Sequence, residues 1–495
     1  MHFVVWVIVL IIIVILLYLI KNRFYDIQFT WFNQPTKEIE KFTNDVSQFN
    51  KTPIDQIFTI TNKNDIHAII TKAQKYNKQI SIHGTKHTMG GHTINKNGYI
   101  INTSKFNKVL QFNSKKKEII VQPGIIWSDL ILYLDPYGLS PMTLQSYSSF
   151  SVGGTISVNA HGITNDYGIY KSVIELGIIN SINQELTCSR NQNQELFSLV
   201  IGGYGLFGII TWVKLKLVNN VKLVTEYVKL NAFNFNDKYQ QILKDPSINI
   251  KLARININNM NDISLYIFRE SKKSNKLVIS NVHTKNPEMS KVSQFLYKWI
   301  FPSPVFQEIR YDIENITKNP IDIGNKNERN LILYESANPV TQLYSPIIDL
   351  NATHILQEFF IPLTGFLDFM NYLKQVFLTH KFKYVTLLNI TIRYVFKDTT
   401  TFLNYAKTDM YAFVLYYRLP RKLICDRELH IIHNLLTTKT LALDGTFYLP
   451  YRHHYTKEQL QTSYPQIKKF FELKQEYDPN NLFSNMWYKE YLLIK

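Results

Sequence analysis

The alternation of apolar and polar positions divides the chain into regions with different predicted structure. From Ile57 to Val218, short runs of β-branched residues alternate with glycine-containing turns, which is typical of β-strands. Helix-like spacing lies between these runs. This region is expected to form an α+β domain, with strands at 79–84, 98–103, 118–124 and 208–218 and helices at 65–76 and 127–134.

Residues 220–445 carry longer amphipathic segments and few glycines. A strand over 356–363 is expected to lead into a helix over 365–380, and further strands are expected at 386–396 and 410–419. With three or four strands in all, this region predicts a second α+β domain with an antiparallel sheet. Near the end of the chain, a helix is expected at 464–477, stopped by Asp478-Pro479.

The amino terminus carries the longest apolar run. Residues 3–20 hold no charge, and at about 1.5 Å per residue they just span a hydrocarbon core. Trp6 and Tyr18 lie toward the two ends, where aromatic rings prefer the membrane interface. A cleaved signal peptide is the alternative, but the run lacks a basic n-region and an A-x-A-like cleavage site. We expect one transmembrane anchor, with Lys21 and Arg23 placing the rest of the chain in the cytosol.

Composition narrows the class of protein. The chain has 495 residues, 45% of them apolar, so it is long enough for two or three domains with sizeable cores. Two cysteines, Cys188 and Cys425, exclude a disulfide scaffold. The net charge of +17 could indicate nucleic-acid binding. However, the lysines are scattered among Asn and Ile residues, and no nucleic-acid-binding motif is present. We therefore expect no nucleic-acid partner.

Four glycine-rich or polar turns stand between apolar runs. Such turns present successive backbone N–H groups, and glycine lets a phosphate approach the backbone closely. The turns are His83 to His92 (HGTKHTMGGH), Ser151 to Gly162 (SVGGTISVNAHG), Asn165 to Gly168 (NDYG) and Gly202 to Gly208 (GGYGLFG).

Two familiar motif interpretations fail. Gly203, Gly205 and Gly208 match G-x-G-x-x-G, but a strand follows them where a dinucleotide fingerprint requires a helix. The spacing of His83, His87 and His92 suggests a metal, but a third ligand with zinc-like spacing is missing. We expect no metal site.

The order of these turns resembles the FAD-binding domain of the vanillyl-alcohol oxidase (para-cresol methylhydroxylase, PCMH, type) flavoprotein superfamily. The C-terminal KFFELKQEYDPNNLFSNMW resembles the closing helix and turn of that family. Within the superfamily, NAHG and GGYGLFGII resemble the decaprenyl-phosphoryl-ribose oxidase group, while the middle region is similar to sugar-lactone and alditol oxidases. The predicted arrangement of an N-terminal membrane anchor before the FAD-binding domain also resembles the architecture of the sterol Δ24-reductases.

The resemblance implies a domain division and a cofactor. The expected parts are a transmembrane anchor (1–23), a connector (24–50), a two-subdomain PCMH-type FAD-binding domain (51–220), a substrate or cap domain (221–445) and a C-terminal segment that returns to the FAD domain (446–495). The residues implied to contact FAD are Gly84, Thr85, Lys86, His87, Thr88, Met89, Gly90, Gly91, Ser146, Ser151, Val152, Gly153, Gly154, Asn159, His161, Gly208, Ile209, Ile210 and Tyr448. His87 stands where some members link FAD covalently, and a non-covalent loop histidine is the alternative.

The catalytic residues implied are Tyr451, Arg393 and His161. Tyr451 is a candidate acid, base or hydrogen-bond donor, and Arg393 occupies a place like the substrate-site arginine of the lactone oxidases, with an ordinary surface arginine as its alternative. Glu358 is a weaker candidate base. Ile163 and Tyr451 stand where the decaprenyl-ribose group carries lysines, so the substrate of that group is not expected here.

The function implied is oxidation of a CH–OH group by hydride transfer to flavin N5, on a sugar-like, lactone or prenyl-linked small molecule. The electron acceptor, whether oxygen, a quinone or a protein, stays open. Two alternatives remain. One is a flavin-dependent reductase or dehydrogenase acting on a lipid C–C bond, and the other is a catalytically inactive flavoprotein fold used for binding.

Overall fold

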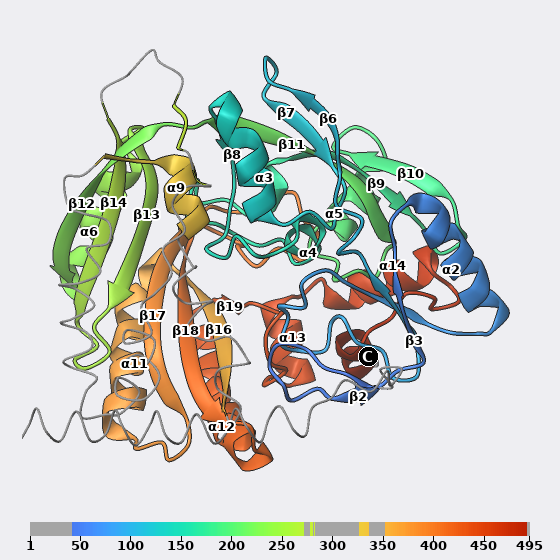
Figure 1. Ribbon diagram of the computed structural model, residues 1–495. Helices are drawn as coiled ribbons and strands as arrows, with labels where there is room; N and C mark the ends of the chain where they lie inside the picture. Colours follow the sequence, from blue (N-terminus) through green and yellow to red (C-terminus); the bar gives the residue numbers. More distant parts are fainter. Residues whose placement is uncertain (1–41, 272–277, 281, 283–325, 336–351, 493–495) are drawn as a thin grey trace, which may run out of the picture. The chain divides into compact units, whose positions relative to one another are not determined.

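Three β-sheets and a short two-stranded ribbon organise the residues that the computed structural model describes (Figure 1). These residues are 42–271, 278–280, 282, 326–335 and 352–492. Within them, no helix has the length and apolar character needed to cross a bilayer. The predicted anchor at 3–20 lies outside the described residues.

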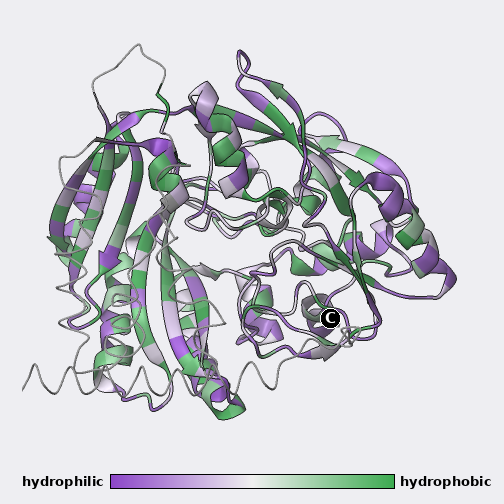
Figure 2. Cartoon of the chain, in the orientation of Figure 1, coloured by the Kyte–Doolittle hydropathy of each residue, from purple (hydrophilic) through white to green (hydrophobic). Residues whose placement is uncertain are grey.

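A small parallel sheet follows the β1–β2 ribbon (Phe42–Thr43 and Thr52–Pro53). Its order is β3-β5-β4, from Gln56–Thr59, Tyr99–Asn102 and Ile80–His83. Helix α2 (Lys63–Lys75) begins at a capping box, in which Asn62 accepts a hydrogen bond from the Asp65 backbone. Its buried face consists of isoleucines and one alanine, whereas its outer face is hydrophilic (Figure 2). This amphipathic pattern explains why the sequence predicts the helix within two residues.

The second sheet is antiparallel and has the order β10-β9-β11-β7-β6, with β8 paired to one end of β11. Two short helices beside it, α3 (Trp127–Leu134) and α4 (Val152–Ser157), are joined by a hydrogen bond that the Trp127 indole donates to Thr155 Oγ1. The elements are β6 (Val109–Asn113), β7 (Glu118–Val121), α3 (Trp127–Leu134), β8 (Leu139–Pro141), α4 (Val152–Ser157), β9 (Val173–Ile179), β10 (Glu185–Ser189), α5 (Gln194–Val200) and β11 (Ile209–Asn219).

The third sheet has eight strands in the order β15-β12-β14-β13-β17-β18-β16-β19. Its antiparallel pairing is as predicted, but three or four strands was too low a number. β12 and β13 were missed because charged and polar residues there interrupt the regular alternation that predicts a strand. The strands are β12 (Lys222–Asn231), β13 (Ile248–Ile255), β14 (Asp262–Glu270), β15 (Lys326–Glu328), β16 (Ala352–Pro362), β17 (Thr386–Val395), β18 (Met410–Pro420) and β19 (Thr446–Phe447).

Helices cover this sheet and extend from its ends. Phe235 of α6 stacks on Phe366 of α11 with ring centroids 4.9 Å apart, and both rings pack against Tyr411 of β18. These aromatic contacts form the centre of the core on that face. The helices are α6 (Ala232–Leu243), α9 (Arg329–Glu335), α11 (Phe366–Thr379) and α12 (Leu423–Ala442).

The C-terminal segment joins the large sheet to the small parallel one. It starts as β19, which pairs with β16. It ends beside β4, where the Ile80 N–H donates to the Leu482 carbonyl (2.6 Å) and the Ser484 N–H donates to the Ile80 carbonyl (2.9 Å). The helices between and after these contacts are α13 (Lys457–Ser463), α14 (Ile467–Tyr477) and α15 (Met486–Tyr491).

Candidate active site

The turn after β4 packs on the C-terminal segment. The Met89 N–H donates to the Pro450 carbonyl (2.8 Å), and the Gly91 N–H donates to the buried Asp45 carboxylate (2.9 Å). Gly91 has a φ of 69°, in the left-handed region that favours glycine. A Cβ on Gly90 would lie 2.5 Å from the Tyr451 carbonyl oxygen. Glycine is therefore required here for close approach of the protein to itself.

The first two glycine-rich turns lie against each other. A Cβ on Gly84 would lie 2.1 Å from Ser151 Oγ, and the Ser151 N–H donates to Thr85 Oγ1 (3.4 Å). Ser151 also caps α4 by accepting from the Gly154 N–H (3.3 Å). These contacts bring together two of the segments implied to bind FAD, which are 67 residues apart at Gly84 and Ser151.

Asn159 is held entirely by protein contacts. Its φ of 46° is left-handed, and its side chain donates to Asp398 (3.0 Å) and Thr401 (3.3 Å). Its carbonyl accepts from the Tyr405 phenol (2.8 Å). The structure thus gives this asparagine a structural role, and its implied contact with a cofactor stays a prediction.

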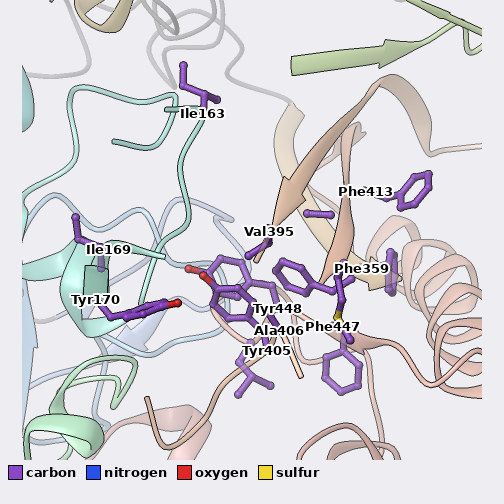
Figure 3. Close-up of a cluster of buried hydrophobic side chains, with 14 of the residues drawn as sticks. Ile163, Ile169, Tyr170, Phe359, Val395, Tyr405, Ala406, Phe413, Phe447 and Tyr448 are labelled. Atoms are coloured by element: carbon purple, nitrogen blue, oxygen red, sulfur yellow. The ribbon is translucent and has the colours of Figure 1, made fainter. Parts of the chain in front are cut away.

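Two tyrosines hold the backbone at Asn159 and its neighbour. The Tyr448 phenol donates to the Val158 carbonyl (2.7 Å), next to the bond made by Tyr405. The two rings lie edge to face with centroids 5.2 Å apart (Figure 3). Burial raises the pKa of both phenols well above 10, so both remain hydrogen-bond donors at neutral pH.

Glu358 connects two of the three predicted catalytic residues. Its carboxylate Oε1 lies 2.5 Å from His161 Nε2, and both side chains are almost completely buried. Burial raises the pKa of Tyr451 well above 10, and the negative charge of Glu358 and a hydrogen bond to it add to that rise. The nearby charge of Arg393 acts in the opposite direction. His161 therefore pairs with a buried carboxylate, and the charges of that carboxylate and of Arg393 both act on the Tyr451 phenol.

Arg393 reaches this cluster from the large sheet. Glu358 on β16 and Thr391 on β17 are both paired with Val414 on β18, so Glu358 and Arg393 share one face of the sheet. The Arg393 Nη2 donates to Ser146 Oγ (2.7 Å). Arg393 is half-buried and bonds to Ser146, a residue implied to contact FAD, and its place in a substrate site stays a prediction.

A second buried ion pair stands beside the cluster. Lys251 of β13 pairs with Asp166, and each side chain is only 6% exposed. The pKa of Asp166 is raised because burial outweighs the opposing charges of Lys251 and His161. The turn at Asn165–Gly168 signalled Asp166, whereas Lys251 in an amphipathic-looking segment gave no signal in the sequence.

The remaining predicted site residues divide between loop and core. Lys86 has a left-handed φ of 58°, and Gly208 has a φ of 138° at the start of β11. Ile209 and Ile210 are buried, with Ile209 in the core of the small sheet. Val152 is also buried. The side chains of Val152, Ile209 and Ile210 pack in the core, so any contact of these residues with a cofactor would come from their backbone.

The His87 ring lies between two loops. Its Nδ1 is 3.0 Å from the Thr85 carbonyl, its Nε2 is 3.4 Å from Ser149 Oγ, and its ring meets Phe150 edge to face. Burial lowers the pKa of His87 to about 4, so the imidazole is neutral at pH 7. With its proton on Nδ1, the ring presents the lone pair of Nε2.

The histidines considered as metal ligands do not converge. His83 contacts the Gly84 carbonyl, while His92 packs against the rings of Tyr204 and Trp487. The described residues contain no group of three or more His, Cys, Asp or Glu side chains arranged to hold a metal.

Several buried polar atoms in or next to the segments implied to form the site have no hydrogen-bond partner among the residues that the structure describes. A buried polar group without a partner costs free energy, so such atoms indicate where a polar ligand would bond. They are Thr88 Oγ1, Gln145 Oε1, His161 Nδ1, Arg393 Nε and both ring nitrogens of His92. The pyrophosphate, ribityl hydroxyls and ring carbonyls of FAD would satisfy atoms of this kind, so the residues present fit the cofactor.

Comparison with known proteins identifies two family models along the chain. Residues 54–184 match the model of the FAD binding domain, and residues 334–491 match that of D-arabinono-1,4-lactone oxidase. The fold and the site thus define an FAD-dependent oxidoreductase.

Individual relatives narrow the class further. L-gulonolactone oxidase of Mus musculus is 22% identical over 458 residues, which span 90% of this chain and 97% of that enzyme. D-arabinono-1,4-lactone oxidase of Yarrowia lipolytica is 29% identical over 159 residues, 31% of this chain and 30% of that enzyme. Cytokinin dehydrogenase 2 of Arabidopsis thaliana is 33% identical over 141 residues, 28% of each chain. The chain thus resembles the sugar-lactone oxidases of the vanillyl-alcohol oxidase (PCMH-type) flavoprotein family.

Proposed function

We propose that this chain oxidises a CH–OH group of a sugar lactone at the cluster of His161, Tyr451 and Arg393. The observation that carries the proposal is the buried pair of His161 and Glu358, together with Arg393, which lies on the same sheet face as Glu358 and bonds to Ser146. A sugar lactone presents a ring carbonyl and several hydroxyls. An arginine fork and a phenol O–H are suited to bind such a molecule and orient it.

FAD would be held by the turn from Gly84 to Gly91, by Ser146 and by the segment from Ser151 to His161. Tyr448 would support the last of these segments through Val158. When bound, FAD supplies a two-electron acceptor for the hydride that leaves the substrate carbon. The chain itself orients the substrate hydroxyl, excludes water and accepts the hydroxyl proton. The fragments 51–220 and 446–495 would thus serve the cofactor, and 221–445 would cover the substrate.

Full-length similarity to the mouse enzyme supports a lactone over a prenyl-linked substrate. The sequence departures at Ile163 and Tyr451 point the same way, since the lysines of the decaprenyl-ribose group are missing. We further propose that residues 3–20 anchor the enzyme in a membrane with the catalytic part in the cytosol, because this run is long, apolar and followed by basic residues. Release of the full chain by alkaline carbonate would contradict the anchor.

The test is anaerobic reduction of the bound flavin, followed by its visible absorbance. L-gulono-, L-galactono- and D-arabinono-1,4-lactone should each be tried, with NADPH and a sterol alcohol as rivals. Bleaching by at least one lactone is expected. Bleaching by NADPH alone would favour a lipid reductase, and no bleaching by any reductant would favour an inactive binding module. Acid precipitation of the same sample settles the linkage at His87, because covalent flavin stays in the pellet.

A further inference from the structure

The first turns of α12 expose a group of apolar side chains. Leu423 is 70% exposed, Ile424 is 51% exposed and Ile431 is 58% exposed. Ile431 lies two helical turns after Ile424, so these side chains share the outer face of the helix. On the opposite face, Cys425 and Leu429 are buried. Single exposed apolar residues are common, but a group on one face of a surface helix indicates contact with an apolar partner.

The available charges beside these side chains are positive. Lys422 is the N-cap residue of the helix and Arg427 lies between the exposed apolar residues. Both are exposed, and neither forms an ion pair in the part of the chain that the structure describes. The neighbouring carboxylates are engaged, because Asp426 pairs with an arginine (2.7 Å) and Glu428 accepts from three backbone N–H groups of residues 383–385. The exposed apolar and basic residues together form the α12 patch, which consists of Lys422, Leu423, Ile424, Arg427 and Ile431.

The chain enters the described fold beside the α12 patch. The Thr353 hydroxyl of β16 donates to the Ser47 carbonyl (2.8 Å). Thr353 is in register with Leu419 of β18, the strand that leads into α12. Arg452 makes a second link, because it bonds to Asn50 Oδ1 (3.0 Å) and to the ion-paired aspartate in the first turn of α12 (2.7 Å). The segment that follows β1 therefore lies next to the first turn of this helix.

Resting on the proposed anchor at residues 3–20, we propose that the α12 patch docks on the anionic surface of the same membrane. Residues 21–41 join the anchor to β1 and reach at most about 70 Å, at about 3.3 Å per residue, so the described fold stays near the bilayer. The apolar side chains of the patch enter the headgroup layer, while Lys422 and Arg427 contact the negative groups of the lipids.

A second copy of this chain fits the patch less well. In a two-fold contact the same surface meets itself, so Lys422 and Arg427 would face their own copies. Like charges placed against each other across an interface are unfavourable. An anionic lipid surface supplies both an apolar layer and negative charge.

The test measures whether the patch enters the lipid of vesicles that carry the full chain. An environment-sensitive thiol label is attached at Ile424→Cys, and at Ile182→Cys as a matched control. Ile182 is also an exposed isoleucine (60%), in the β9–β10 turn far from α12 (Figure 1). The natural Cys188 and Cys425 are buried, and the wild-type chain is the labelling blank. In phosphatidylcholine vesicles containing phosphatidylserine, nitroxide-labelled lipid should quench the label of I424C and leave that of I182C unquenched.

Removing the two positive charges tests the role of the anionic lipid. In the I424C background, K422Q/R427Q should lower the ratio of quenched to unquenched label about fivefold for each charge removed. K115Q/K116Q is the matched control, because it removes two charges from the exposed β6–β7 turn, far from α12 (Figure 1). That control should leave the ratio unchanged. Both double variants should keep the wild-type flavin content and melting temperature, since all four side chains are exposed.

Several outcomes would overturn the docking surface. These are equal quenching at the two label positions, equal quenching of I424C in vesicles of phosphatidylcholine alone, and no effect of K422Q/R427Q. A label at I424C that is shielded from water without lipid quenching, in a chain of doubled mass, would assign the patch to a second copy instead.

The outcomes also separate this proposal from the anchor and from catalysis. If alkaline carbonate releases the full chain, the anchor is wrong, and the labelled full chain is then added to preformed vesicles. Quenching of I424C there would still support the patch, and its absence would overturn it. No substrate is used, so failure of the lactones to reduce the flavin leaves this result unaffected.

Discussion

At the scale of single residues, Arg393 shows how a motif gains meaning from its neighbours. The sequence placed it on a strand, where a surface arginine was an equal alternative. In the structure its Nη2 bonds to Ser146 Oγ, and its Nε is buried without a partner in the described part of the chain. One side of the guanidinium is therefore committed to the protein, and the other is available to a substrate.

We predict that Arg393→Lys lowers kcat/KM for the lactone by about 10- to 100-fold, because a hydrogen bond to a charged group contributes about 1.5–3 kcal/mol and the lysine lacks the planar fork. The loss should appear mainly as a higher KM, measured by steady-state kinetics. Arg269→Lys is the control, since Arg269 pairs with Glu226 elsewhere on the same sheet. An unchanged KM in R393K would remove Arg393 from the substrate site.

At the scale of elements, α4 depends on how closely it approaches the loop after β7. The Gly153 N–H donates to the Pro123 carbonyl (2.8 Å), and a Cβ on Gly153 would lie 2.5 Å from Pro123 Cβ. Gly154 is different, because it is exposed and an added Cβ would approach only Ser151 Oγ (2.9 Å). The two neighbouring glycines of one motif thus have different physical reasons to be glycine.

This difference predicts separable phenotypes. Gly153→Ala should displace α4, lower the melting temperature by several degrees and release flavin, because overpacking costs about 1–3 kcal/mol. Gly154→Ala should keep the wild-type melting temperature of the flavin-free protein, since alanine is favoured in a helix, but it should weaken flavin retention if the cofactor approaches this backbone. Thermal unfolding of flavin-free protein and flavin content after gel filtration measure the two effects. Equal destabilisation by both substitutions would contradict the assignment.

The sequence predicts the helices and strands whose apolar residues recur at a regular spacing, and it misses those whose spacing is irregular. α3 was predicted to the residue and β17 to within one, because their apolar spacing is regular. β12 and β13 were missed because charged residues interrupt the alternation. The motif turns were found from glycine and polar residues alone, but the cluster at Glu358 was only partly visible. Its members are separated by up to 290 residues in sequence, from His161 to Tyr451, and only strand pairing and the returning C-terminal segment bring them together.

At the scale of the whole molecule, buried neutral histidines link stability to pH. Burial lowers the pKa of His83 and His87 to about 4, and burial also lowers that of His454 to about 4 although Asp426 opposes it. An unfolded histidine has a pKa near 6.5, so between pH 6.5 and about 4 the unfolded chain binds more protons than the folded one. The free energy of unfolding must therefore fall as the pH falls through this window.

The fall should be about 1.4 kcal/mol per pH unit for each such histidine, reduced by buried carboxyls such as Asp166 and Asp398, whose raised pKa values act in the opposite direction. We predict that denaturant unfolding at pH 7, 6 and 5 gives a steadily lower free energy of unfolding. His83→Asn should reduce that slope by up to about 1.4 kcal/mol per pH unit, which is the contribution of one histidine. Asn cannot titrate, and the substitution breaks no ion pair. Asp426 does not obscure this window, since His454 and Arg452 outweigh its burial and hold its pKa at about 2. A slope that His83→Asn leaves unchanged would show that this histidine titrates normally in the folded protein.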